Sequence, residues 1–297
     1  MDDLTELPGN RAIVIQNITC PYCGISLQSD NDTKEHVIGR RFVPKGSLNG
    51  HWNLIVRACT KCNHAKSILE DDISAITLAA RYWFEPLDSD ESLLEGIRHK
   101  AKKSISKITR KKVIDSQEKT DLKVDLTSSA SLTFDLVAPP QVESERLHEL
   151  ARMQLMAIFY FLTFNKTKKT GGFWRGGFYV LPEAHHADWG NELHKSFMNI
   201  VAAWKPRWLG DTADGFFRSI IRKHPSEECW SWALEWNKNY RLIGFIGAQA
   251  PVEEVVSTLT HPKIMHIDTG VNSWVRFRAE TQIADEEDCL FAWDGAE

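Results

Sequence analysis

The chain has 297 residues, of which 42% are hydrophobic and 26% are charged, a composition typical of a soluble globular protein with one large or two smaller domains. Its longest apolar runs, such as Met153 to Phe164, are shorter than the roughly 20 residues that a membrane span needs. The acidic N-terminus lacks the basic and apolar regions of a secretory signal. We therefore expect a cytoplasmic protein with no membrane partner.

The positive charge is concentrated, although the formal net charge is only -4. Residues 98–112 contain eight Lys or Arg and no carboxylate. Such a patch can neutralise phosphates even on an acidic protein, while a merely solvated face is the alternative. Five of these residues are expected to form one helical stripe that tracks nucleic acid: Lys100, Lys103, Lys107, Arg110 and Lys111.

The first part of the chain predicts a small unit of short strands and tight turns. Residues 12–17, 36–43 and 53–58 are strand-like, and loops separate them. From Asn63 onward the apolar spacing predicts one helix, or two helices broken near residues 70–72.

A further helix is expected to begin after a cap at Asp88 or Ser89 and to continue through residues 92–108 into the basic run. The polar residues 116–121 then suggest a boundary. We predict an α+β protein with an N-terminal module (1–72), a helical extension (73–115) and a C-terminal α+β domain (116–297).

The C-terminal part predicts a mixture of helices and antiparallel hairpins. Alternation over 122–137 and around the Asn-Lys-Asn turn at 237–239 indicates two hairpins, and the tryptophans here are expected to be core. The remaining elements are expected as helices at 142–164, 191–204 and 251–259, and as strands at 171–182, 216–223, 264–268 and 273–280.

Four of the six cysteines form two Cys-x-x-Cys pairs that are separated by 35 residues. Two thiolates on one turn, joined by two from another turn, complete the tetrahedron that zinc prefers. In a reducing compartment this doubled spacing favours one structural Zn²⁺ site over disulfides. The predicted ligands are Cys20, Cys23, Cys59 and Cys62.

Between and beside the cysteine pairs lie Glu35-His36, Asn53-Leu54 and Asn63-x2-Lys66-Ser67. Together with the cysteines, this order and spacing resembles an HNH endonuclease domain with a zinc-knuckle frame, over roughly residues 18–72. The resemblance implies a ββα-metal fold that cleaves a phosphodiester bond of nucleic acid, with DNA as the expected substrate class. Nucleases of this type serve in restriction, phage defence or mobile-element biology, and the sequence does not choose among these.

The resemblance also implies a role for each matched residue. His36 corresponds to the general base, and Asn53 to the residue that fixes the loop around it. Glu35 and Asn63 correspond to the ligands of a catalytic ion, for which two oxygen donors favour Mg²⁺ or Mn²⁺ over Zn²⁺. Lys66 is a candidate phosphate contact, with a solvated helix residue as the alternative.

Three positions depart from the common family pattern. Glu35 stands where Asp is common, Gly39 where Pro often follows, and Asn63 where the family name has His. The neighbouring His64 cannot face the same ion as Asn63 from a regular turn, because consecutive helical residues point about 100° apart. We favour Asn63 as the ligand.

Two other interpretations stay open. In one, the zinc knuckles hold a non-catalytic surface that binds nucleic acid or protein, although such a module does not need Glu35, His36, Asn53 and Asn63 together. In the other, the C-terminal domain carries the principal activity; otherwise that domain could recognise substrate, sense a signal, form a homodimer or bind a partner protein. No phosphate loop or nucleophile elbow points to a second activity there.

Overall fold

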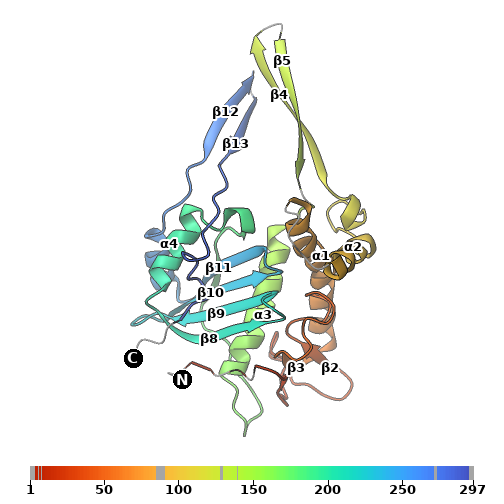
Figure 1. Ribbon diagram of the computed structural model, residues 1–297. Coiled ribbons are helices and arrows are strands. Elements are labelled where there is room, and N and C mark those ends of the chain that lie inside the picture. Colours follow the sequence, from red (N-terminus) through yellow and green to blue (C-terminus); the bar gives the residue numbers. More distant parts are fainter. Residues whose placement is uncertain are drawn as a thin grey trace.

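The computed structural model describes residues 4, 5, 7, 9–84, 91–127, 130–138, 140–270 and 273–293. Within these ranges the protein is mixed α+β, with five α-helices and several sheets, which confirms the predicted class. Figure 1 shows a central sheet with a smaller N-terminal unit beside it and two hairpins that rise from the same end of the molecule.

The N-terminal unit is a three-stranded sheet that leads directly into a long helix. Its strands are β1 (Ile13–Val14), β2 (Asp32–His36) and β3 (Leu54–Cys59), and the helix is α1 (Thr60–Phe84). The sheet has the order β1-β3-β2, with β1 parallel and β2 antiparallel to β3. Since α1 begins one residue after β3, the end of the strand and the first turn of the helix are held close together.

Two predictions about this unit are wrong in detail. The second strand covers residues 32–36, not 36–43, because Phe42 donates its backbone N–H to the carbonyl of Gly39 in a turn and residues 42 and 43 are buried as loop. The helix α1 is continuous through residues 70–72. Its acidic side chains there are paired, Glu70 with Lys66 and Asp72 with Arg146, so they do not break the helix.

The basic residues do not form one helical stripe. The helix α2 (Glu91–Lys103) ends before Lys107, and a bridge between Ile105 and Lys112 then encloses a turn. The chain leaves the helix because Ser104 and Ser106 are buried and the backbone N–H of Lys107 donates to Asp72. Lys100 and Lys103 therefore lie on α2, and the other three stripe residues lie in the turn. The predicted cap at residues 88 and 89 falls outside the described residues.

The C-terminal part is built around a six-stranded antiparallel sheet in the order β6-β11-β10-β9-β8, in which β7 also pairs with β11. The strands are β6 (Gly177–Val180), β7 (Ala184–His185), β8 (Lys205–Thr212), β9 (Phe217–Lys223), β10 (Cys229–Trp236) and β11 (Tyr240–Gly247). The helices are α3 (Ser144–Leu162), α4 (Glu192–Val201) and α5 (Gln249–Ser257). The two projecting hairpins are β4 (Glu118–Thr127) with β5 (Ala130–Ala138), and β12 (Met265–Gly270) with β13 (Ser273–Phe277).

These elements confirm the predicted helices and hairpins of the C-terminal part, with two strands that the sequence did not indicate, the two-residue β7 and the longer β8. Strand β8 contains Pro206 and Gly210, which lowered its strand signal. It lies at the edge of the sheet and carries a bulge between Pro206 and Trp208, a position where proline removes no central hydrogen bond.

Both faces of the central sheet are buried, and alternate residues of each strand serve different clusters. Leu234 and Trp236 of β10 pack toward α3 and the N-terminal unit, whereas Ala233 packs toward α4 and α5. Burial on both sides explains why the strands are almost continuously apolar. The predicted core role of the tryptophans is confirmed for Trp208, Trp232 and Trp236, which are fully buried.

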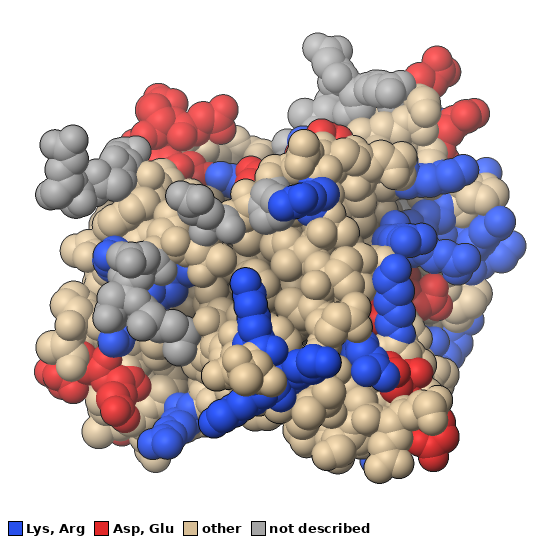
Figure 2. Space-filling model, turned by 90° about the horizontal axis from the view of Figure 1, so that it is seen from below, with Lys and Arg blue, Asp and Glu red and all other residues tan. Residues whose placement is uncertain are grey.

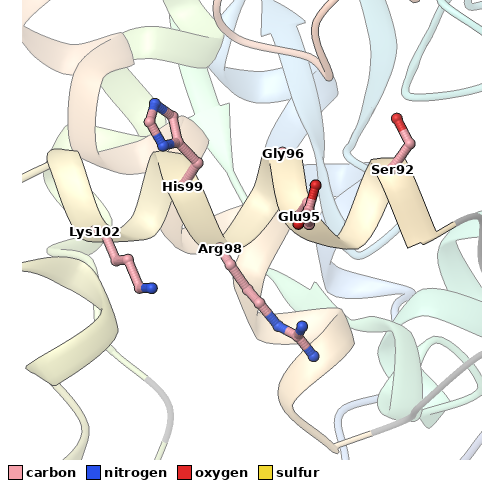
Figure 3. A pocket seen from close by; sticks show the side chains of 6 residues that line it. All are labelled: Ser92, Glu95, Gly96, Arg98, His99 and Lys102. Carbon is pink, nitrogen blue, oxygen red and sulfur yellow. The ribbon is translucent and has the colours of Figure 1, made fainter.

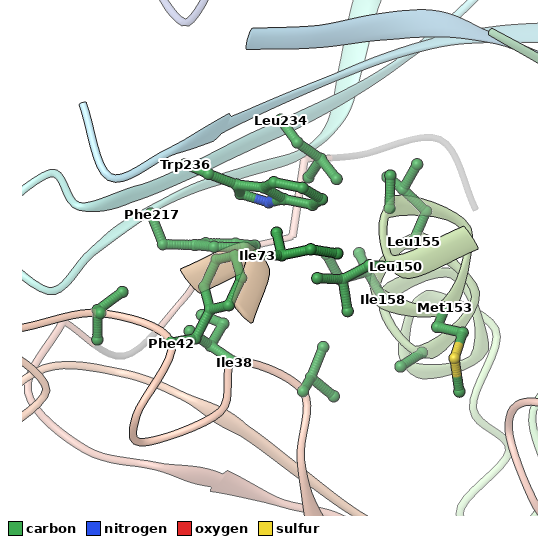
Figure 4. Packing of buried hydrophobic residues seen from close by; sticks show 14 of the residues in the cluster. Ile38, Phe42, Ile73, Leu150, Met153, Leu155, Ile158, Phe217, Leu234 and Trp236 are labelled. Carbon is green, nitrogen blue, oxygen red and sulfur yellow. The ribbon is translucent and has the colours of Figure 1, made fainter. Parts of the chain in front are cut away.

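The first of these clusters joins residues from all three predicted segments of the chain. Figure 4 shows Phe42 of the N-terminal loop, Ile73 of α1 and Leu150 of α3 meeting Trp236 of the sheet. The rings of Phe42 and Trp236 meet edge to face, with 5.3 Å between centroids. The N-terminal unit is therefore packed against the sheet by a common hydrophobic core.

Polar contacts cross the same boundary at the turn between β10 and β11. The fully buried side chain of Asn237 donates through Nδ2 to Thr77 Oγ1 at 2.7 Å and to the carbonyl of Phe42 at 3.3 Å. Its φ is 56°, a left-handed conformation that Asn tolerates better than most residues.

None of the described helices contains a stretch that is both long and apolar enough to span a bilayer.

We predict that Asn237→Ala destabilises the protein by about 2–4 kcal/mol, because it leaves buried partners unpaired and strains the left-handed backbone. Asn237→Gly removes the same hydrogen bonds without that strain and should cost less. Chemical denaturation followed by tryptophan fluorescence measures both. Equal stability of Asn237→Ala and wild type would contradict a structural role for this contact.

Candidate functional site

The four predicted zinc ligands meet at the base of α1. Their sulfur atoms all lie within 4.8 Å of one another, and Cys23 Sγ is 3.8 Å from Cys59 Sγ. Zn–S bonds of about 2.3 Å in a tetrahedron place sulfurs about 3.8 Å apart, so the spacing fits one ion. The cluster can hold a metal ion such as zinc, as predicted.

The local backbone conformation positions both cysteine pairs of this cluster. The first pair lies in a tight turn, where the N–H of Gly24 donates to the carbonyl of Cys20 at 2.9 Å and Gly24 has a φ of 75°. The second pair lies at the junction of β3 and α1, where the N–H of Cys62 donates to Cys59 Sγ at 3.4 Å. Backbone N–H groups aimed at sulfur stabilise thiolates, the form that binds metal.

A buried lysine joins β2 to α1 directly beside the cluster. Lys66 is 1% exposed, and its ammonium lies 2.8 Å from Glu35 Oε1, 2.6 Å from Glu70 Oε1 and 3.1 Å from the carbonyl of His36. Burial alone would lower the pKa of Lys66, but Glu70 and Glu35 outweigh it and raise that pKa. The predicted phosphate contact of Lys66 is therefore wrong in this structure, because its three donors are used inside the protein.

Glu35 is held in one orientation by these contacts. Tyr22 donates its hydroxyl to Oε1 at 3.4 Å, the same oxygen that Lys66 contacts, and neither contact uses Oε2. Burial raises the pKa of Glu35, and the charge of Lys66 acts against that rise. Among the described residues, these contacts leave the second carboxylate oxygen open to another ligand.

Asn63 lies in the first turn of α1 and faces β2. Its Nδ2 donates to Thr33 Oγ1 at 2.8 Å, a bond that leaves Oδ1 unused. Thr33 and Glu35 are two residues apart on β2 and so share one face of the strand. The neighbouring His64 is exposed.

His36 ends β2 and is half-buried, and its Nε2 has no hydrogen-bond partner among the described residues. Burial, together with the positive charges of Arg40, Lys34 and Lys66, lowers the pKa of His36 from its ordinary value of 6.5. The imidazole is consequently neutral at pH 7 and able to accept a proton.

Asn53 closes the loop that follows His36. Its Oδ1 accepts from the N–H of Ile38 at 3.3 Å, and its Nδ2 donates to the carbonyl of the same residue at 2.8 Å. A side-chain amide that satisfies both backbone groups of one residue fixes the chain there. This placement corresponds to the positioning role expected for Asn53.

Two residues of the site were not found from the sequence. Glu70 accepts from Lys66 and from the N–H of Gly39 at 3.2 Å, and Tyr22 binds Glu35. The spacing of Lys66 and Glu70, four residues apart on a helix, could have indicated the first pair. Nothing in the sequence marks Tyr22, since the contact depends on how the cysteine turn packs against β2.

The predicted nucleic-acid contacts differ in accessibility. Lys103, Arg110 and Lys111 are exposed, and Lys107 is half-buried. Lys100 packs against the carbonyl of Arg41, and burial lowers its pKa to about 7. Figure 2 shows Lys and Arg side chains gathered on the side of the molecule where Figure 1 places α2 and β2.

An open hollow of about 530 Å³ lies along α2. Figure 3 shows that its six lining residues all come from this one helix, with Arg98, His99 and Lys102 among them. A hollow formed by one exposed helical face, without Glu35, His36 or the cysteines, extends the basic surface and is separate from the candidate site.

No family model, curated protein or solved structure matches this chain.

We predict that the protein binds one equivalent of Zn²⁺ and that Cys59→Ser loses it. Because metal binding contributes folding free energy on the order of 10 kcal/mol, this variant should fail to fold the N-terminal unit. Metal analysis and circular dichroism test both points. Cys289→Ser is the matched control, since Cys289 is exposed and outside the cluster, and its metal content and spectrum should equal those of wild type.

Proposed function

We propose that the protein is a metal-dependent endonuclease of the HNH type, which hydrolyses phosphodiester bonds of nucleic acid, with DNA as the expected substrate. The observation that supports this most strongly is the grouping of Glu35, His36 and Asn63 where β2 ends and α1 begins, next to the four cysteines. A zinc module that only binds a partner has no need of this set.

The donor set suits a hard divalent ion such as Mg²⁺ or Mn²⁺. Glu35 Oε2 and Asn63 Oδ1 are the two oxygens left unused by the contacts that orient their side chains. Two oxygen donors leave room for waters and a phosphate oxygen, as such ions require. When bound, the ion would supply charge stabilisation to the phosphate and the leaving 3′-oxygen.

His36 is suited to act as the general base. Its unpartnered Nε2 and lowered pKa give a neutral acceptor that can take a proton from an attacking water. Lys66 donates to the carbonyl of His36, and Asn53 fixes the backbone at Ile38, so together they hold the chain at the base and just after it. These two residues act by positioning.

The ion pair of Lys66 with Glu35 favours the second candidate function, a non-catalytic zinc module that binds nucleic acid or protein. In such a binding module, Glu35 would serve only to neutralise the buried ammonium of Lys66. The two functions differ in the expected effect of replacing His36. An endonuclease needs this side chain for cleavage, whereas a binding module does not need it.

We predict that the protein cleaves plasmid DNA with Mg²⁺ or Mn²⁺ and that His36→Ala lowers the rate by about 10²–10⁴-fold, the usual contribution of a general base. Asn63→Ala should abolish cleavage, while the exposed neighbour His64→Ala should leave it unchanged. Each variant should keep its zinc and its fold. Full activity of His36→Ala, or intact DNA with every ion tested, would favour the binding module.

The exposed basic residues of α2 and the turn after it are expected to bind the phosphate backbone. We predict that the double variant Lys103→Glu, Lys111→Glu weakens DNA binding at all sequences and lowers the slope of log affinity against log salt by about 2. The control is Lys166→Glu, Lys168→Glu, which makes the same charge change at two exposed lysines in the loop after α3. Equal losses in both variants would mean that net charge, not this surface, sets the affinity.

A further inference from the structure

The β4–β5 hairpin projects from the body of the protein, as Figure 1 shows. Among the described residues it forms a two-stranded sheet, in which β5 pairs with β4 alone. Strand β5 has nine residues, contains neither glycine nor proline, and carries one charge, on Asp135. A long edge strand of this kind presents a row of backbone donors and acceptors to another strand.

The side chains of this strand are also unusually apolar for their exposure. Leu132 and Phe134 are each 48% exposed and lie two residues apart, on one face of β5, and Val137 is 47% exposed. A lone two-stranded hairpin is marginally stable in water, and exposed groups of large apolar side chains mark interaction sites. Strand β4 lies against β12 of the other hairpin, and the exposed apolar side chains of β5 point to a further partner on that strand.

We propose that β5 pairs with β5 of a second copy of this chain, antiparallel and across a two-fold axis at Phe134. Phe134 is the midpoint of Ala130–Ala138, so all nine residues pair in this register. The register sets position 132 opposite position 136, and Thr133 opposite Asp135, whose carboxylate can accept from the threonine hydroxyl.

Self-complementarity is the reason to choose a second copy as the occupant. In the register centred on Phe134 no two charges of the same sign face each other. A register centred one residue later would set Asp135 against Asp135, which is destabilising. The register that pairs all nine residues is therefore free of like-charge repulsion, whereas the one centred on Asp135 is not.

The first test is cross-linking of the full-length protein at the axis. Phe134→Cys should give a disulfide-linked dimer under mild oxidation, because directly opposed residues have Cβ atoms about 4.5–5.5 Å apart. Leu132→Cys is the control: its counterpart lies four residues along the strand, about 13 Å away, and should stay unlinked. Wild type gives the background from the native exposed Cys23 and Cys289.

The second test separates pairing between copies from stability within the hairpin. Thr133 lies opposite Lys123 inside the hairpin and opposite Asp135 of the second copy in the proposed dimer. Thr133→Lys should therefore tighten the dimer and Thr133→Asp weaken it, each by about 2- to 30-fold in the dimer dissociation constant, measured by sedimentation equilibrium. If the two substitutions acted only through Lys123 within the hairpin, Thr133→Asp would tighten the dimer and Thr133→Lys would weaken it.

Dimers that cross-link through position 134 and follow the predicted order of the Thr133 variants support the proposal. A wild-type protein that stays monomeric across the concentration range overturns it and indicates a different occupant of the strand. So does cross-linking of Leu132→Cys as efficient as that of Phe134→Cys, or the reverse order of the Thr133 variants.

Discussion

The candidate site depends on one buried ammonium group. Lys66 has three N–H donors and three acceptors, from β2, from α1 and from the backbone of His36. Burying a charge costs several kcal/mol unless it is fully paired, so the folded state is favourable only when these acceptors converge on Lys66. The same convergence fixes the Glu35 carboxylate and the end of β2, and Glu70 extends it to the N–H of Gly39.

This polar centre is supported from two sides by interactions of different kinds. The cysteine cluster ties the first turn of α1 to the knuckle at residues 20–23, and the hydrophobic cluster around Phe42 and Trp236 ties the loop after His36 to the central sheet. Trp52 adds a further link, since its Nε1 donates to the carbonyl of Asp211 in β8 at 2.6 Å. The C-terminal sheet thus holds the loop that follows the candidate base.

The sequence predicted the parts of this arrangement that are local. The cysteine pairs, the hairpins and the helices have short-range spacing or periodicity, and the structure confirms them. The sequence did not predict β8, because Pro206 and Gly210 hide an edge strand, or the end of α2, because burial of Ser104 and Ser106 stops the helix. The sequence also did not predict the burial of Lys66, because that burial depends on how α1 packs on β2. A lysine on an amphipathic helix is normally predicted to be exposed to solvent.

The sheet edges of this protein differ in how well they are protected against pairing with another chain. The central sheet ends at β6, which has four residues, and at β8, where Pro206 and a bulge interrupt the edge. Short strands, proline and bulges all hinder pairing with another chain. Strand β5 has none of these features, although it is longer and stands away from the body. The central sheet is thus protected at both ends, whereas β5 offers an edge without these protections, and Asp135 disfavours the alignment in which it would face its own copy.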